Sequence, residues 1–275
     1  MQRTNIGDQR QISTNGTLLK GIVQSVSYLE CEDIKGLLES YNLDGYGVTQ
    51  DYFVPDGTVL DAKTIQRKSR SMMPLEYVYK SAKDFKWDMY CEDVETQKKI
   101  ANIFVVKFEE FKKQGRGLFI SSKTKGSGKT FLACCIANEV LKDHDISVKF
   151  VTVPDYLEIV KDKDKKDLIS EILNCSLLIL DDIGVETDKQ EWINNALFRL
   201  VDSRKNRMLP TIYTSNYAMD ELPGEERITE RVIECSVPLV MPEQNIRRKK
   251  AEEKTKDSLQ EVMKDDSGEE GVKHD

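Results

Sequence analysis

The hydrophobic pattern of the chain becomes regular at Pro74. From there, short apolar runs alternate with stretches of helical periodicity. The apolar runs are LFIS (118–121), SVKFVTV (147–153), SLLILDD (176–182), PTIYTSN (210–216) and SVPLVM (236–241). Near-continuous apolar strands that alternate with helices are typical of a parallel sheet covered on both faces. The pattern therefore predicts an α/β domain over residues 74–248, with a parallel five-stranded sheet flanked by helices.

The helical periodicity predicts where the covering helices lie. The longest amphipathic stretch is residues 92–114, and its expected buried face consists of Val94, Ile100, Ile103, Phe104, Phe108 and Phe111. Further helices are expected over residues 130–143, 154–173, 188–207 and 224–234.

Residues 1–73 are less regular and are expected to form a small N-terminal partner-binding region with a linker. Residues 18–43 have helical spacing, residues 44–61 suggest turns with a short hairpin, and the basic stretch 62–74 suggests a linker. The buried positions expected in the first of these stretches are Ile22, Val26, Leu29, Ile34, Leu37 and Leu38. The highly charged tail, residues 249–275, is expected to be a solvated helix that frays into disorder.

Composition narrows the class of protein. No apolar run approaches the ~18 residues of a membrane span, and the N-terminus has no apolar signal-peptide core. We therefore expect a cytoplasmic protein without a membrane partner. The six cysteines form no CxxC pair, and the two histidines, His144 and His274, are too scattered for a zinc site.

The net charge of −7 changes the expectation for nucleic acid. A chain this acidic needs local basic patches, summed over several subunits, to bind DNA. The candidate patches are Lys161 to Lys166 and Arg204, Lys205 and Arg207, with Arg67, Lys68 and Arg70 as further candidates.

The stretch SSKTKGSGKTFL (121–132) lies between a predicted strand and a predicted helix, where a phosphate-binding loop belongs. Small residues let backbone N–H groups wrap phosphates, a lysine reaches the phosphate oxygens and a hydroxyl reaches Mg²⁺. The residues expected to bind ATP are Lys125, Gly126, Ser127, Gly128, Lys129, Thr130 and Phe131. The alternative to a phosphate-binding loop is a flexible loop that only connects the strand to the helix.

Lys123 occupies the position of the first glycine in the pattern GxxxxGK[ST]. Either a residue other than glycine turns there at modest strain, or the loop is degenerate and binds nucleotide weakly.

The strand ends supply candidate catalytic groups. Asp181 is expected to hold Mg²⁺ together with Thr130, and Asp182 lies where many such ATPases carry a glutamate as general base. Aspartate is one methylene shorter, so slow hydrolysis is expected. Asn216 follows the next strand and is a candidate to orient the attacking water, or a turn asparagine. The alternative for the two acids is that they face solvent.

Two arginine pairs complete the candidate chemistry. Arg227 and Arg231 are four residues apart on one helix face, where they are either a finger for a neighbouring subunit's phosphate or partners of Glu226 and Glu230. Arg247, with Arg248 beside it, reaches the phosphates or forms a basic patch.

These motifs, in this order, resemble the DnaC/DnaI-type bacterial and phage helicase loaders among the AAA+ ATPases, which implies a protein of a bacterial cell or a phage. The resemblance covers residues 74–248 and includes the aromatic lead-in DFKWDMY (84–90). It assigns Lys129 and Thr130 to Walker A, Asp181 and Asp182 to Walker B, Asn216 to sensor 1, Arg231 to the arginine finger and Arg247 to sensor 2.

The resemblance implies an ATPase that uses ATP and Mg²⁺ and loads a hexameric replicative DNA helicase onto single-stranded DNA. In such loaders the N-terminal region binds the helicase, and ATP drives self-association and release. Two departures stand out: Lys123, and the lack of a cysteine cluster in residues 1–70. The alternatives are an IstB-type transposition helper ATPase and a non-hydrolysing, nucleotide-switched helicase adaptor.

Overall fold

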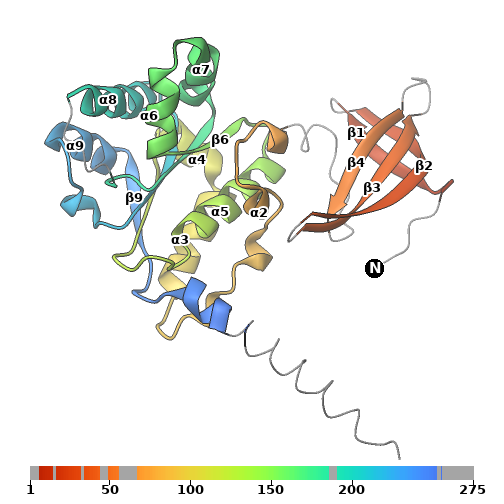
Figure 1. Cartoon of the computed structure of the whole chain (residues 1–275), viewed down its shortest axis with the longest axis horizontal. Helices are drawn as coiled ribbons and strands as arrows, with labels where there is room; N and C mark the ends of the chain where they lie inside the picture. The colour runs from red at the N-terminus through yellow and green to blue at the C-terminus, as the bar shows by residue number, and fades with distance from the viewer. Residues whose placement is uncertain are drawn as a thin grey trace, which may run out of the picture.

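The computed structural model describes residues 6–14, 17–31, 34–43, 49–55, 67–185, 191–252 and 255. These residues form two separate sheets, a four-stranded sheet near the N-terminus and a five-stranded sheet in the larger α/β domain (Figure 1). Within the described residues, no helix is long and apolar enough to cross a membrane.

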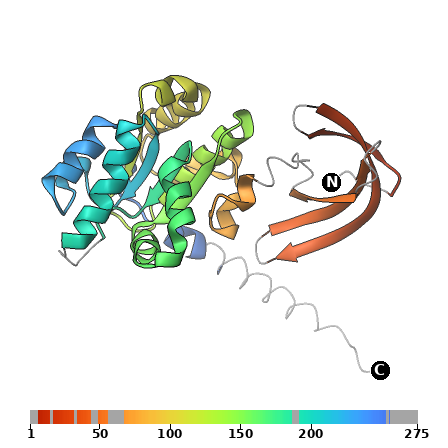
Figure 2. The same ribbon diagram turned by 90° about the horizontal axis from the view of Figure 1, so that it is seen from above.

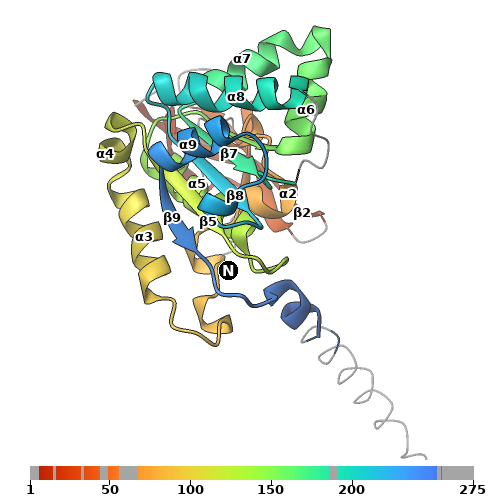
Figure 3. The same ribbon diagram turned by 90° about the vertical axis from the view of Figure 1, so that its left-hand side faces the viewer.

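The five-stranded sheet is parallel throughout, as the apolar runs predict. Its strands are β5 (Gly117–Ser121), β6 (Val148–Thr152), β7 (Leu177–Asp181), β8 (Thr211–Ser215) and β9 (Ser236–Val240). They lie in the order β6-β7-β8-β5-β9, with every neighbouring pair parallel (Figure 3). The chain leaves β5, starts again at the far edge of the sheet and returns strand by strand. In such sheets, ligands bind beyond the carboxyl ends of the strands, where the order switches.

Helices cover both faces of this sheet. One face carries α3 (Glu95–Val106), α4 (Phe108–Lys113) and α5 (Lys129–Asp143); the other carries α6 (Val153–Lys161), α7 (Lys166–Asn174), α8 (Glu191–Asn206) and α9 (Glu226–Glu234). Successive side chains of β5 enter opposite cores: Leu118 and Ile120 pack on the α5 side and Phe119 on the α8 side. This alternation explains why the strand is apolar at every position.

Two predicted helices are each divided in the structure. The stretch 92–114 breaks at Lys107, whose ψ of 28° leaves the helical range, so α3 and α4 are separate. Ile103, expected in the core, is 46% exposed, and Ala101 is buried in that part of the helix. The stretch 154–173 breaks at Asp162, where the Asp162 side chain accepts a hydrogen bond from the Asp164 amide. A side chain that bonds the local backbone in this way competes with the helix.

The helical prediction for residues 18–43 is wrong, because these residues form strands. The order is β1 (Gln9–Thr14), β2 (Thr17–Cys31), β3 (Ile34–Leu43) and β4 (Thr49–Pro55), antiparallel throughout and curved (Figure 2). Residues 49–55, expected in a hairpin of their own, pair with β3 instead.

The burial of the N-terminal sheet follows a period of two. Val23 and Tyr41 are fully buried, whereas Ile22, expected to be buried, is 37% exposed, and Val26 is half-buried. β-branched residues favour such half-buried sheet positions, and they outweigh the helical spacing here. The side chains of the other expected buried residues (Leu29, Ile34, Leu37, Leu38) lie outside those that the structure describes.

Residues 67–73, expected in the linker, pack on the α/β domain. Ser71 is fully buried, and its carbonyl oxygen accepts a 2.7 Å hydrogen bond from the Phe150 amide of β6. Because β6 is an edge strand, this contact covers part of the open edge of the sheet. A short helix, α2 (Leu75–Val78), follows. At the other end, residues 246–252 are helical, and most of the predicted tail lies outside the described residues.

Candidate nucleotide-binding site

The loop between β5 and α5 has two glycines, Gly126 and Gly128, in left-handed backbone. Gly126 has φ 77° and Gly128 has φ 95°, a range that favours glycine. Both are also hemmed in, since a Cβ atom would lie 2.6 Å from Asn245 Oδ1 at the first position and 2.9 Å from the Tyr90 hydroxyl at the second. α5 begins directly after Gly128, so its N-terminal amides face the loop, as in anion sites.

The side chain of Lys129 lies inside the loop. Its ammonium group donates hydrogen bonds to the Ser122 carbonyl (3.1 Å), the Thr124 carbonyl (3.2 Å) and Ser127 Oγ (3.2 Å). The side chain is 6% exposed, and this burial lowers the pKa of Lys129. The loop is therefore curled around a single positive charge.

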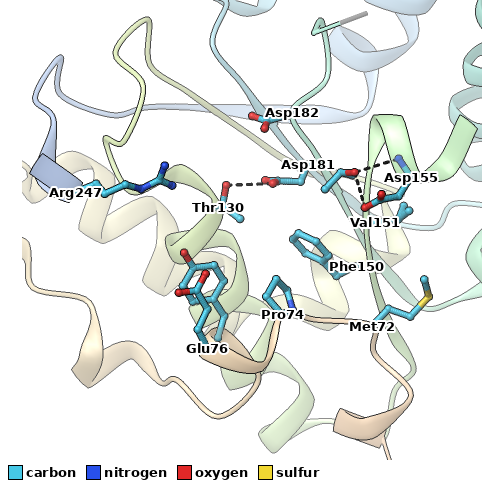
Figure 4. Close-up of a pocket in the computed structure, with 12 residues that line it drawn as sticks. Met72, Pro74, Glu76, Thr130, Phe150, Val151, Asp155, Asp181, Asp182 and Arg247 are labelled. Carbon is cyan, nitrogen blue, oxygen red and sulfur yellow. Dashed lines mark hydrogen bonds between the residues drawn. The ribbon is translucent and has the colours of Figure 1, made fainter. Parts of the chain in front are cut away.

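Asp181, at the end of β7, faces the first turn of α5. Its carboxylate accepts a hydrogen bond from Thr130 Oγ1 (3.2 Å; Figure 4). It accepts a second from Thr214 Oγ1 (2.6 Å). Burial raises the pKa of Asp181 to about 6. A carboxylate beside a hydroxyl is an oxygen donor set that suits Mg²⁺, so these two residues fit the metal that the sequence predicts.

Asp182 and Asn216 lie at the same edge of the sheet. Asp182 has φ 59°, and its amide donates a 2.9 Å hydrogen bond to Thr214 Oγ1, which fixes the turn after β7. Asn216 directly follows β8, which lies between β7 and β5. The sequence-predicted acids, the loop lysine and the amide therefore share the carboxyl edge of three neighbouring strands.

A pocket of about 460 Å³ opens beside these residues (Figure 4). The predicted site residues that line it are Thr130, Asp181, Asp182 and Arg247. The remaining lining residues, which sequence reasoning missed, are Met72, Pro74, Glu76, Tyr77, Phe150, Val151, Thr152 and Asp155.

One missed residue had a local sequence signal. Thr152 Oγ1 accepts a 3.2 Å hydrogen bond from the Asp155 amide and donates a 2.7 Å bond to the Asp155 carboxylate. This is the pattern of a helix N-cap with an acid three residues later, which is readable in the sequence. The residues from 72 to 77 carry no such signal, because a distant segment brings them to the pocket.

Comparison with known proteins assigns the family. The family described as "IstB-like ATP binding protein" matches residues 55–230, which is more than half of the chain. The chain belongs to this ATP-binding family.

Several relatives are helicase loaders. The replicative helicase loader DnaI of Bacillus subtilis (strain 168) is 28% identical, over 87% of this chain and 85% of its own length. The replicative helicase loader DnaC of Escherichia coli (strain K12) is 32% identical over 122 residues, 42% of this chain and 49% of its own. A crystal structure of DnaI is 26% identical with a TM-score of 0.54, covering 66% of this chain and 98% of that one. The α/β domain therefore has the AAA+ fold.

Lys123, in place of the first Walker A glycine, has ordinary backbone. Among the described residues, the non-glycine residues with positive φ are Met72, Asp182 and Met208, and Lys123 is not one of them. Its amide donates a 2.8 Å hydrogen bond to Glu243 Oε1, and its ammonium group forms a 2.9 Å ion pair with Glu221. The loop therefore has no need of a left-handed residue at this position.

Of the two candidate sensor-2 arginines, Arg247 lies at the pocket. Its amide donates a 3.1 Å hydrogen bond to the Gly126 carbonyl, which ties the C-terminal segment to the phosphate loop. The Arg248 side chain is 79% exposed and pairs with Glu252.

The aromatic lead-in supports the same loop. The Tyr90 hydroxyl donates a 2.6 Å hydrogen bond to the Ser127 carbonyl, and the Phe85 ring lies 5.6 Å from that of Phe131. Phe131 thus packs beneath the loop, among aromatic side chains.

Arg231 lies outside the pocket of its own chain. Its guanidinium group pairs with Asp202 of α8 (3.0 Å) and with Glu234 (3.0 Å), and the side chain is 35% exposed. Arg227 pairs with Glu225 and lies over the Phe198 ring at 4.3 Å. The predicted partners, Glu226 and Glu230, are not the acids in these pairs.

The structure corrects the predicted DNA-binding patches. Arg204 is 1% exposed and Lys68 is 6% exposed, so neither is available to a DNA backbone. Lys205 pairs with Glu234. The predicted candidates that are exposed are Arg70, Arg207 and the lysines of the stretch 161–166. Of these lysines, Lys161 lies over the Trp192 ring at 4.7 Å.

Proposed function

We propose that this protein is an ATP-dependent loader that delivers a hexameric replicative DNA helicase onto single-stranded DNA during replication initiation. The observation that supports the proposal is a candidate nucleotide site within a chain that is similar to DnaI over 87% of its length. In that site, Lys129 lies in the loop and Thr130 contacts Asp181.

Hydrolysis would proceed by positioning and electrostatic stabilisation. Lys129 and the first amides of α5 would hold the phosphate oxygens, and Thr130 with Asp181 would hold Mg²⁺, which neutralises charge on the phosphates when bound. Asn216 would orient a water molecule, and Asp182 would accept its proton as the water oxygen bonds to the γ-phosphorus and ADP leaves. Because aspartate reaches less far than glutamate, we expect slow turnover.

Self-association would complete the site. Arg231 does not line its own pocket and pairs with Asp202 and Glu234, so we propose that it serves the phosphates of a neighbouring copy. To do so, its guanidinium group must exchange Asp202 and Glu234 for the phosphate. Ion pairs at a surface are weak, so this exchange costs little.

DNA contact would use exposed lysines repeated along the assembly. The stretch 161–166 offers several within one copy, and ATP-driven assembly would align copies along a single strand. The N-terminal sheet, residues 9–55, is the proposed helicase-binding region.

Co-purification with a replicative helicase tests the proposal. We expect a complex that forms with nucleotide, together with ATPase activity that single-stranded DNA changes. Capture of a transposase instead would favour the transposition helper. A helicase complex with nucleotide binding but no turnover would favour the non-hydrolysing adaptor.

A further inference from the structure

Residues 67–80 are held on α5 by a buried polar hub, which consists of Lys68 and Asn138. Lys68 is 6% exposed, and its ammonium group donates hydrogen bonds to the Val78 carbonyl (2.9 Å) and to Asn138 Oδ1 (3.2 Å). The Tyr79 ring lies 5.5 Å from the same ammonium group. A buried charge is retained only when its hydrogen bonds are satisfied, so this lysine is committed to the contact.

Asn138 completes the hub from the α5 side. It is 3% exposed, and its Nδ2 donates hydrogen bonds to the Tyr77 carbonyl (2.8 Å) and the Lys80 carbonyl (2.9 Å). Together, Lys68 and Asn138 close residues 68–80 into a loop whose two ends meet on one helix.

The closed loop forms one wall of the nucleotide pocket. Met72, Pro74, Glu76 and Tyr77 all line the cavity that also contains Thr130 and Asp181 (Figure 4).

The conformation of this wall depends on the contacts that hold residues 67–80 on the α/β domain. Met72 has φ 61°, a left-handed conformation that is strained for a residue other than glycine and persists only where the surroundings impose it. The hub at one end and the bond from the Phe150 amide to the Ser71 carbonyl supply those surroundings.

We propose that Lys68 is a positioning residue of the nucleotide site, and that nucleotide binding and docking of residues 67–80 stabilise each other. The inference rests on the proposed function, because it takes the ligand of this pocket to be a nucleotide. Coupling of this kind is reciprocal: a segment that improves the site must itself be held more firmly when the site is filled. Residues 67–80 follow the N-terminal sheet in the chain. A nucleotide that stabilises them therefore acts on the connection between that sheet and the α/β domain.

Lys68→Met tests the positioning role, because it keeps the apolar stem and removes the hydrogen-bonding head. Lys83→Met is the matched control, since Lys83 is exposed in the neighbouring turn Ala82–Asp84. We expect the first variant to raise the Kd of a fluorescent ATP analogue and the KM for ATP about tenfold, with kcat changed less than about twofold. The control should leave all three constants unchanged. Wild-type affinity in a folded Lys68→Met protein would overturn the inference and leave the proposed function intact.

Hydrogen exchange of the wild-type chain tests the coupling between nucleotide binding and docking of residues 67–80, even if the Lys68→Met variant does not fold. The amides of Tyr77 and Val78 donate to the Pro74 carbonyl (2.9 and 3.0 Å), and that of Lys80 donates to the Tyr77 carbonyl (3.0 Å). Saturation with a non-hydrolysable ATP analogue and Mg²⁺ should slow their exchange about tenfold or more. Unchanged exchange at saturation would overturn the inference alone. If the wild-type chain bound no nucleotide at all, both the inference and the proposed function would fail.

Discussion

At the scale of single residues, three positions of the phosphate loop have distinct requirements. Gly126 and Gly128 combine left-handed backbone with crowded surroundings, so no other residue fits without movement. Lys123 has neither constraint, and its side chain points to Glu221 rather than into the loop. The loss of the first glycine from the pattern is therefore compatible with a working site.

Lys129→Ala is expected to abolish nucleotide binding without unfolding the chain. The ammonium group contacts only the loop itself, and the residue opens α5, where alanine is a good helix former. Calorimetric titration with ATP should show an affinity loss of at least about 100-fold, because a phosphate-bound charge is removed. A circular-dichroism melt provides the control for folding, and wild-type affinity would refute the site.

Lys123→Gly is expected to leave ATP affinity within about twofold of wild type, since an exposed ion pair contributes little. The Glu243 carboxylate bonds the backbone amide at this position, and that contact survives the substitution. Calorimetry makes the comparison. A tenfold loss would mean that the Lys123 ammonium group leaves Glu221 to contact phosphate.

Because Asp181 is buried, we expect pH to change folding stability and nucleotide affinity in opposite directions. Its folded pKa of about 6 lies above the 3.8 of a free aspartate, so the group favours the folded state when protonated. That contribution to stability is full below the unfolded pKa and is lost as pH rises through about 6.

Binding of Mg²⁺–nucleotide should follow the opposite trend, because it needs the carboxylate. Affinity is expected to fall as pH drops through about 6, and titrations from pH 5 to pH 8 measure it. Asp181→Asn should bind weakly and without this pH step; a step that persists in the variant would assign it to another group.

At the scale of elements, the sequence predicts well where two signals agree. All five strands of the parallel sheet combine an apolar run with a neighbouring helical stretch, and each lies within about one residue of its expected range. The stretch 18–43 fails because its spacing fits a helix while its β-branched residues favour strands, and the antiparallel pairing decides. The pocket wall at 72–77 could not be predicted, because it depends on the contact between Lys68 and Asn138, 70 residues apart.

The charge of Arg204 suggests DNA binding from the sequence, but in the structure this residue connects secondary-structure elements. Its guanidinium group donates to the carbonyls of Ile172 (3.1 Å) and Cys175 (3.0 Å) at the end of α7, and to that of Pro210 (2.8 Å) before β8. It joins α7, α8 and the sheet, so its role is structural rather than DNA binding.

Arg204→Ala is expected to lower the free energy of unfolding by about 2–4 kcal/mol, because several buried carbonyls lose their donor. Arg199→Ala on the exposed side of α8 is the matched control and should change it by less than about 0.5 kcal/mol. Urea denaturation measures both. Equal stability of the two variants would contradict the structural role.

At the scale of the whole molecule, the proposed arginine finger lies apart from the pocket of its own copy. Thr130, the two acids and Arg247 line one pocket, while Arg231 is held at the surface by Asp202 of α8. A site that needs a second copy makes hydrolysis depend on assembly, and in a loader it would depend on the helicase and DNA that organise the assembly.

Mixing two inactive variants tests this division. Arg231→Ala keeps Lys129 and should bind ATP normally, but it should lose hydrolysis and ATP-driven assembly. Lys129→Ala keeps the arginine and should lose nucleotide binding. In a mixture, an interface that pairs the intact loop of one variant with the intact arginine of the other restores a complete site.

The measurement is ATPase activity across a titration of the two variants at constant total protein. We expect activity above the sum of the separate variants, with a maximum at intermediate ratios. Arg227→Ala is the matched control, one helical turn away and stacked on Phe198, and should retain most of the activity. If the mixture never exceeds the sum, while Arg231→Ala alone turns over normally, then Arg231 serves only its own ion pairs with Asp202 and Glu234. In that case the neighbour's phosphate must be met by another residue, or the site must work without one.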